Sequence, residues 1–161
     1  MIRSKFNTGV YFIVVLLVCT TALMIFLIRE IYINIQTSIY FIPVLLCVAF
    51  VWVFLFFGEL RTKAIFISMD NVFIHKRSYL GWGKIQQYTI REFNGFTTSV
   101  FNTENGYYEY LYLKKENRKV IKLSQYYHKN YNVLKEHIKD HLKNLGTEPF
   151  KLSHEIKESF C

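Results

Sequence analysis

The chain has 161 residues, with 20 Lys and Arg against 12 Asp and Glu and a formal net charge of +8. The basic residues form no dense Arg/Lys stripe, so we do not expect a nucleic-acid-binding protein. Its three cysteines have neither metal-ligand nor disulfide-framework spacing, so we expect no metal site. No Gly-rich phosphate loop appears either, and we expect no cofactor.

Two apolar runs, residues 10–28 and 39–58, contain no charged side chain. About 20 helical residues cross a hydrocarbon core of roughly 30 Å, so each run is long enough to span a bilayer. The link, residues 29–38, is short and predicts an antiparallel helical hairpin. Without ionisable groups the hairpin is expected to be a lipid-facing anchor. An oligomeric pore lined by backbone or by Thr20 and Thr21 stays open as the alternative.

The basic residues nearest the spans predict the orientation of the hairpin. Arg3 and Lys5 lie in the N-terminal segment 1–9, Arg61 and Lys63 follow the second run, and the link has only Arg29. The positive-inside rule therefore places both termini in the cytoplasm and the link outside. The first run is longer than a signal-peptide core and no small-x-small cleavage site follows it, so we expect it to be retained.

After Gly58 the sequence alternates in short segments typical of strands. Ile65, Ile67 and Met69 share one face, the pair Asp70-Asn71 is typical of a turn, and Leu111 and Leu113 share another face. The strands are expected at residues 63–69, 72–79, 84–90, 95–101, 107–114 and 119–124, with Leu80 to Gly83 as a break and 102–106 as a hairpin connection. Strands this close together leave no room for parallel crossovers, so an antiparallel sheet is expected.

The apolar period then changes to that of a helix. Tyr131, Leu134, Ile138, Leu142 and Leu145 form one stripe. Asn130 is the expected N-cap and Gly146 the expected stop. The predicted fold is therefore a membrane α-hairpin followed by an α+β domain over residues 63–146. That domain would be a curled antiparallel sheet or small barrel of six or seven strands, closed by the C-terminal helix, with residues 147–161 as a tail.

This order resembles the bacterial pleckstrin-homology-like (PH-like) domains of small membrane proteins. The resemblance rests on the pairs Ile65-x-Ile67 and Val72-x-Ile74 around Asp70-Asn71, on the segment Ile90 to Phe96, and on the final helix. It implies a non-enzymatic scaffold in the bacterial inner membrane. Eukaryotic members bind phosphoinositides through basic residues around the first hairpin turn. Here that turn, Ser68 to Asn71, is short and acidic, so the resemblance implies the fold and no ligand.

Two sets of residues are candidate binding surfaces. Tyr108, Tyr110 and Tyr112 alternate with the core leucines and would form an adhesive outward row for a protein partner, unless the helix or a neighbouring strand covers them. Several basic residues occupy strand ends and could face phospholipid headgroups, unless they are simply solvated. These are Lys76, Arg77, Lys84, Lys114, Lys115, Arg118, Lys119 and Lys122.

No residue pattern points to catalysis. His137 and His141 share a helix face but lack the glutamate of zinc proteases and a third ligand, so an exposed helix face is expected. The sequence therefore predicts a membrane-anchored, non-enzymatic module whose partner is the lipid bilayer and, in addition, another membrane protein or a second copy of the chain. The alternative is a small channel or transporter subunit that acts through the hairpin.

Overall fold

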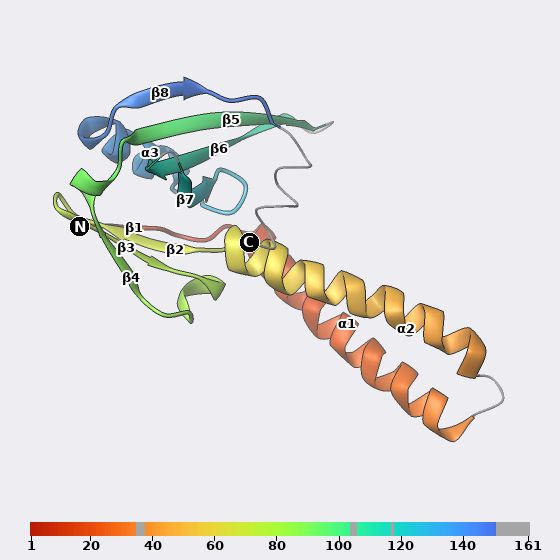
Figure 1. Ribbon diagram of the computed structural model, residues 1–161. Coiled ribbons are helices and arrows are strands. Elements are labelled where there is room, and N and C mark those ends of the chain that lie inside the picture. The colour runs from red at the N-terminus through yellow and green to blue at the C-terminus, as the bar shows by residue number, and fades with distance from the viewer. Residues whose placement is uncertain (35–37, 104–105, 117, 151–161) are drawn as a thin grey trace.

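The computed structural model describes residues 1–34, 38–103, 106–116 and 118–150. Two long helices extend away from a domain made of two sheets and one further helix (Figure 1). The long helices leave the same end of that domain, where the N-terminal strand and the strand after the second helix lie side by side.

The helical hairpin is formed by α1 (Thr8–Ile33), α2 (Ser38–Val53) and a π-helical continuation, η2 (Phe54–Leu60). Both helices are long and apolar enough to cross a membrane, and they include the two runs predicted from the sequence. Asn7 begins α1 by accepting a hydrogen bond from Thr8 N at 2.8 Å. Large apolar side chains such as Phe12 and Phe50 are exposed along the hairpin, which is the pattern of a lipid-facing surface.

The first sheet has the antiparallel order β1-β2-β3-β4. The predicted turn between its two central strands is confirmed, because Asp70 Oδ1 accepts hydrogen bonds from Val72 N at 2.9 Å and Phe73 N at 2.7 Å. The strands are β1 (Ile2–Arg3), β2 (Phe66–Met69), β3 (Phe73–Arg77) and β4 (Gln86–Thr89), with the short helices η3 (Tyr79–Gly81) and η4 (Ile90–Glu92) on either side of β4.

The N-terminal residues belong to this sheet rather than merely preceding the first helix. In β1, Ile2 lies opposite Met69, and Ser4 then exchanges hydrogen bonds with Ile67, from Ser4 N to the carbonyl at 2.7 Å and from Ile67 N to the hydroxyl at 2.9 Å. The side chain of Asn130 accepts from Lys5 N at 2.7 Å and donates to Arg3 O at 2.8 Å. The segment before the first helix is therefore held between the first sheet and the start of the last helix.

The second sheet has the order β7-β6-β5-β8. Its strands are β5 (Gly95–Thr103), β6 (Gly106–Lys115), β7 (Arg118–Ser124) and β8 (Asn144–Thr147). The expectation of a purely antiparallel sheet is wrong at one place, because β8 pairs with β5 in parallel. The prediction of six or seven strands also missed β1 and β8. In the part of the chain that the structure describes, eight strands form two sheets of four.

The last helix, α3 (Tyr131–His141), closes the core between the two sheets. Its first three stripe residues, Tyr131, Leu134 and Ile138, are buried as predicted, together with Ile65, Ile67, Met69, Leu111 and Leu113. The predicted stop at Gly146 is wrong: the helix ends at His141, and Leu142 is already extended. Residues 144–147 of the predicted helix end and tail form β8, while residues 151–161 lie outside the described part of the chain.

Candidate functional site

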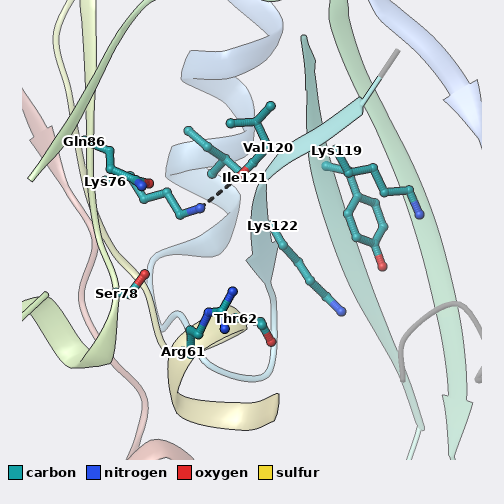
Figure 2. Close-up of a pocket in the computed structure, with 10 residues that line it drawn as sticks. Arg61, Thr62, Lys76, Ser78, Gln86, Lys119, Val120, Ile121 and Lys122 are labelled. Carbon is teal, nitrogen blue, oxygen red and sulfur yellow. Dashed lines mark hydrogen bonds between the residues drawn. The ribbon is translucent and has the colours of Figure 1, made fainter. Parts of the chain in front are cut away.

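A basic cleft of about 360 Å³ opens where the two sheets and the end of the second long helix meet. Figure 2 shows Arg61 and Thr62 at the helix end, Lys76 reaching across from the first sheet, and Lys122 on the opposite side. The lining residues are Arg61, Thr62, Lys76, Ser78, Gln86, Tyr112, Lys119, Val120, Ile121 and Lys122. Four of them carry a positive charge, and none of the described lining residues is acidic.

Lys76 is the best-defined cation of the cleft. It stands in β3 opposite Gln86, and its ammonium donates a hydrogen bond of 2.9 Å to the carbonyl of Val120 in β7. Burial, and secondly repulsion from the nearby Arg61 guanidinium, lowers the pKa of Lys76 below its ordinary value. The fold thus holds two cations close together at the end of the second helix.

The other two lysines pack against the tyrosines of β6. The Lys119 ammonium lies 4.1 Å from the centre of the Tyr112 ring, and Lys122 lies 4.4 Å from that of Tyr110 and 5.4 Å from that of Tyr112. Such contacts hold a long side chain in place without neutralising its charge. Lys119 also forms an ion pair of 3.5 Å with Glu148, so this lysine is balanced in part by a carboxylate outside the lining.

The predicted basic set therefore divides. Lys76, Lys119 and Lys122 line the cleft, whereas Lys114 is paired with Glu148 and Lys115 with Glu92 at 2.5 Å. The remaining three, Arg77, Lys84 and Arg118, are exposed and do not line the cleft. Sequence reasoning used Arg61 only to orient the hairpin. Its position three residues after an apolar run is the signal that could have marked it as part of a site.

The tyrosine row is largely covered. Only 8% of Tyr110 and 2% of Tyr112 is exposed, and Tyr110 stacks on the Phe150 ring with 6.0 Å between ring centres. Tyr108 is half-buried, with an edge-to-face contact of 5.2 Å to Tyr126. Of the expected alternatives, cover by a neighbouring strand applies to Tyr110 and Tyr112, because Lys119 and Lys122 of β7 lie over these rings. The two rings therefore support the cleft lysines.

An apolar groove of about 630 Å³ adjoins the same helix ends. It is lined by Phe6, Tyr11, Val14, Phe56, Leu60, Tyr79, Leu80 and Trp82. Trp82 is 94% exposed, and it follows Tyr79 and Leu80, which adopt the left-handed backbone conformation with φ of 54° and 58°. L-residues pay conformational energy in this region, and such strain is concentrated at functional segments. The sequence had indicated only a break in the strand here.

Polar contacts fix the helix end to the domain between these two cavities. Glu59 pairs with Lys63 at 2.6 Å and accepts a hydrogen bond from the Tyr127 hydroxyl. Burial and the neighbouring carboxylate raise the pKa of Tyr127 far above its ordinary range, so this hydroxyl stays a donor. The domain is therefore held firmly to the second helix.

The histidine pair expected on a helix face lies on α3, with 4.5 Å between the ring centres of His137 and His141. His141 Nδ1 is 2.9 Å from the carbonyl of His137. Within the described residues, no group of three or more His, Cys, Asp or Glu side chains could hold a metal ion.

Comparison of the chain with known protein families, with curated proteins and with solved structures finds no match.

Proposed function

We propose that this protein is a membrane-anchored, non-enzymatic binding module of the bacterial inner membrane. Its hairpin would span the bilayer with both termini in the cytoplasm, and its two-sheet domain would be PH-like and lie against the cytoplasmic leaflet. The order of two sheets followed by a closing helix supports the PH-like assignment. Arg3, Lys5, Arg61 and Lys63 on the domain side of the hairpin support the orientation.

The observation that carries the proposal is the position of the Tyr79–Trp82 segment. It shares a groove with Tyr11 and Val14 of α1 and with Phe56 of η2, residues that belong to the two spans or lie within a few positions of their ends. Trp82 therefore lies at the depth where a bilayer meets water. Aromatic rings favour that interface, and an almost fully exposed indole gains most from it.

Trp82 fluorescence tests whether the domain lies against the bilayer. The chain has only two tryptophans, so Trp52→Phe leaves Trp82 as the single reporter. In nanodiscs containing lipids brominated near the carbonyl end of the acyl chain, we expect strong quenching of Trp82 emission and a blue-shifted maximum. An unquenched maximum typical of water-exposed indole would reject the proposal.

The matched control places the reporter at the opposite end of the same sheet. With Trp52→Phe and Trp82→Phe, the substitution Val72→Trp puts an exposed indole beside the Asp70 turn, far from the helix ends. This reporter should remain unquenched. Equal quenching at both positions would indicate non-specific contact of the domain with lipid.

The channel alternative receives no support from the hairpin. Thr20 and Thr21 donate to carbonyls one turn earlier in their own helix, and Trp52 Nε1 donates to Thr21 Oγ1 at 3.0 Å. These hydroxyls therefore have hydrogen-bond partners within the hairpin itself. A protein partner remains compatible with the proposal, bound by surfaces other than the covered tyrosines.

A further inference from the structure

We infer that the outer face of the first sheet docks an extended, acidic segment of a protein partner. This surface is separate from the basic cleft and lies on the side of the sheet that faces away from the core. The inference deepens the proposed function, because it names the kind of partner that the anchored module binds. It rests on that function only in taking the protein to be a binding module, and it does not require the domain to contact the bilayer.

The strand register places one row of polar side chains across this face. Ile67 and Met69 of β2 are buried in the core, so Ser68 between them points to the opposite side. Ser68 lies opposite Arg3 of β1 and opposite His75 of β3. Residues that lie opposite each other on neighbouring strands share a face, so these three side chains form a continuous row outside the core.

A second row, two residues along the strands, consists of Phe66 in β2 and its partner Arg77 in β3. A cavity of about 430 Å³ is lined by both rows and by Ile85, which directly precedes β4. Arg3 and Arg77 are exposed, and neither has an ion-pair partner among the described residues. None of the described lining residues is acidic. The Asp70 carboxylate of the same hairpin does not line the cavity and accepts hydrogen bonds within its own turn.

Ser68 supplies the observation that points to a ligand. Only 4% of this residue is exposed, and its hydroxyl is buried without a hydrogen-bond partner in the described part of the chain. A buried hydroxyl without a partner costs free energy, which a bound acceptor recovers. The exposed side chain of Arg3 beside it is long and flexible, so it can swing out to pair with a carboxylate and open the hydroxyl to the same ligand.

The spacing of the two arginines fits an extended segment with two carboxylates. Arg3 and Arg77 are separated by one intervening strand and by two residues along the sheet. With about 4.8 Å between strands and about 3.3 Å per residue, their Cα atoms are about 12 Å apart. In an extended peptide, residues i and i+4 are about 13 Å apart and point to the same side, as does residue i+2. A Glu-x-Leu-x-Glu segment therefore places a carboxylate on each arginine and its leucine over Phe66.

The apolar part of the face distinguishes a protein segment from a free anion. Ile85 is 57% exposed and Phe66 is half-buried. A small phosphate leaves both side chains uncovered, whereas an apolar side chain of a peptide covers them. Arginine and aromatic residues are also the types that protein interfaces favour at their centres. The N-terminal end of β1 lies at the end of the sheet opposite the long helices (Figure 1), so a partner reaches this face from the aqueous side of the domain.

The test measures binding of a model peptide to the full-length protein in nanodiscs of phosphatidylcholine, by fluorescence anisotropy. The peptide contains Glu-Ser-Leu-Ser-Glu, an uncharged fluorophore and blocked ends, so its only charges are the two carboxylates. We expect saturable binding. A peptide with Gln at both Glu positions, and an isomer with the two Glu adjacent, should bind about tenfold or more weakly, because each loses at least one arginine–carboxylate contact. Equal affinity of the three peptides would overturn the inference.

Variants of the protein locate the site. Arg3→Gln and Arg77→Gln should each lower the affinity for the peptide about tenfold, by the same loss of a charge-assisted contact. Ser68→Ala removes a hydroxyl that has no partner in the free protein. It should therefore leave the thermal unfolding midpoint unchanged and still lower the affinity about threefold or more.

The matched control is Arg91→Gln with Arg118→Gln, two exposed arginines that do not line the cavity. Its affinity for the peptide should stay within about twofold of the wild type, since surface charges act weakly. A loss in this control as large as that in the cavity variants would show general electrostatic attraction and would overturn the inference.

Two further measurements separate the remaining explanations. Ile85→Ser should weaken binding about threefold, because the peptide leucine loses apolar contact area; unchanged affinity would show recognition of charge alone and would refute the protein segment. Inorganic phosphate at about tenfold excess over the peptide should leave most of the peptide bound, and complete displacement would make the occupant a small anion. Trp82 quenching without peptide binding would overturn this inference alone, whereas peptide binding without quenching would reject only the docked domain.

Discussion

His128 shows how individual side chains connect parts of the chain that are far apart in sequence. Its Nε2 lies 2.9 Å from Ile65 O, its Nδ1 lies 3.0 Å from Ser124 O, and its ring lies 5.8 Å from that of Phe6. Burial lowers the pKa of the imidazole below its ordinary value of 6.5, although both carbonyls oppose the shift. The folded protein therefore holds His128 neutral.

This neutral histidine predicts a loss of stability in mild acid. The unfolded chain binds a proton near pH 6.5 and the folded chain only at lower pH, so the free energy of unfolding should fall as the pH decreases through 6.5. Thermal unfolding should be measured between about pH 8 and 5.5, because Asp and Glu side chains ordinarily change protonation below this pH range. The variant His128→Gln should be less stable at pH 8 and should show a flatter pH dependence.

The exposed His141 provides the control for this measurement. The variant His141→Gln should keep the pH dependence of the wild type. If His128→Gln also kept it, the acid sensitivity would have to arise from another group.

The sequence predicted well the elements that are determined by residues close to one another in the chain. Alternation identified the core faces of β2 and β6, and the helical stripe identified the buried side of α3, because period alone decides which residues face the core. The Asp70 turn was predictable because its side chain bonds to backbone two and three residues later.

The end of α3 and strand β8 could not be predicted in this way. Leu142 and Leu145 continue the helical spacing, yet both are beyond the helix, and Leu145 lies beside Gly95 of β5. A Cβ at Gly95 would stand 2.3 Å from Lys143 O, so only glycine at this position lets the backbone of Lys143 come close to β5. The carbonyl of Lys143 then accepts a hydrogen bond from Phe96 N at 3.0 Å. A contact between residues about 50 positions apart decided the structure here.

The link between β1 and α3 predicts a measurable role for Asn130. Its side chain has hydrogen bonds to Arg3 O and Lys5 N, whereas the expected helix cap is not made by the Asn130 side chain. Asn130→Ala should lower the free energy of unfolding by about 1–3 kcal/mol, because two backbone groups lose their partner. Chemical denaturation in detergent measures the change.

Asn132, two residues later on the exposed face of α3, is the matched control. Asn132→Ala should change the free energy of unfolding by less than about 0.5 kcal/mol, as is usual for surface positions. Equal effects of the two substitutions would mean that the loss at Asn130 comes from the helix itself rather than from β1.

At the scale of the whole molecule, the sequence predicted the hairpin from its long uncharged apolar runs. It predicted the core from the regular spacing of apolar residues in the strands and the last helix. It did not predict the basic cleft, whose cations come from the end of η2, from β3 and from β7. Spacing along the chain cannot bring Arg61, Lys76 and Lys122 together. That requires the packing of one sheet against the other, which only the complete fold defines.

The proposed orientation is tested by labelling of single cysteines in intact cells. In a variant whose native cysteines are replaced, Asn34→Cys in the link should react with an impermeant thiol reagent added from outside. Arg118→Cys, an exposed position in β7, should react only after permeabilisation. Labelling of both positions from the same side would rule out a spanning hairpin.

The pairing of β1 with β2 has a consequence for how the protein is made. Residues 2–7 leave the ribosome before either long helix, whereas β2 and Asn130, to which they bond, are synthesised after both. The first sheet can therefore be completed only when the early segment and the late strand meet in the same compartment. A chain in which a single helix had crossed the bilayer would leave them on opposite sides. If the hairpin spans the membrane as proposed, the domain can close only when the chain has crossed the bilayer an even number of times.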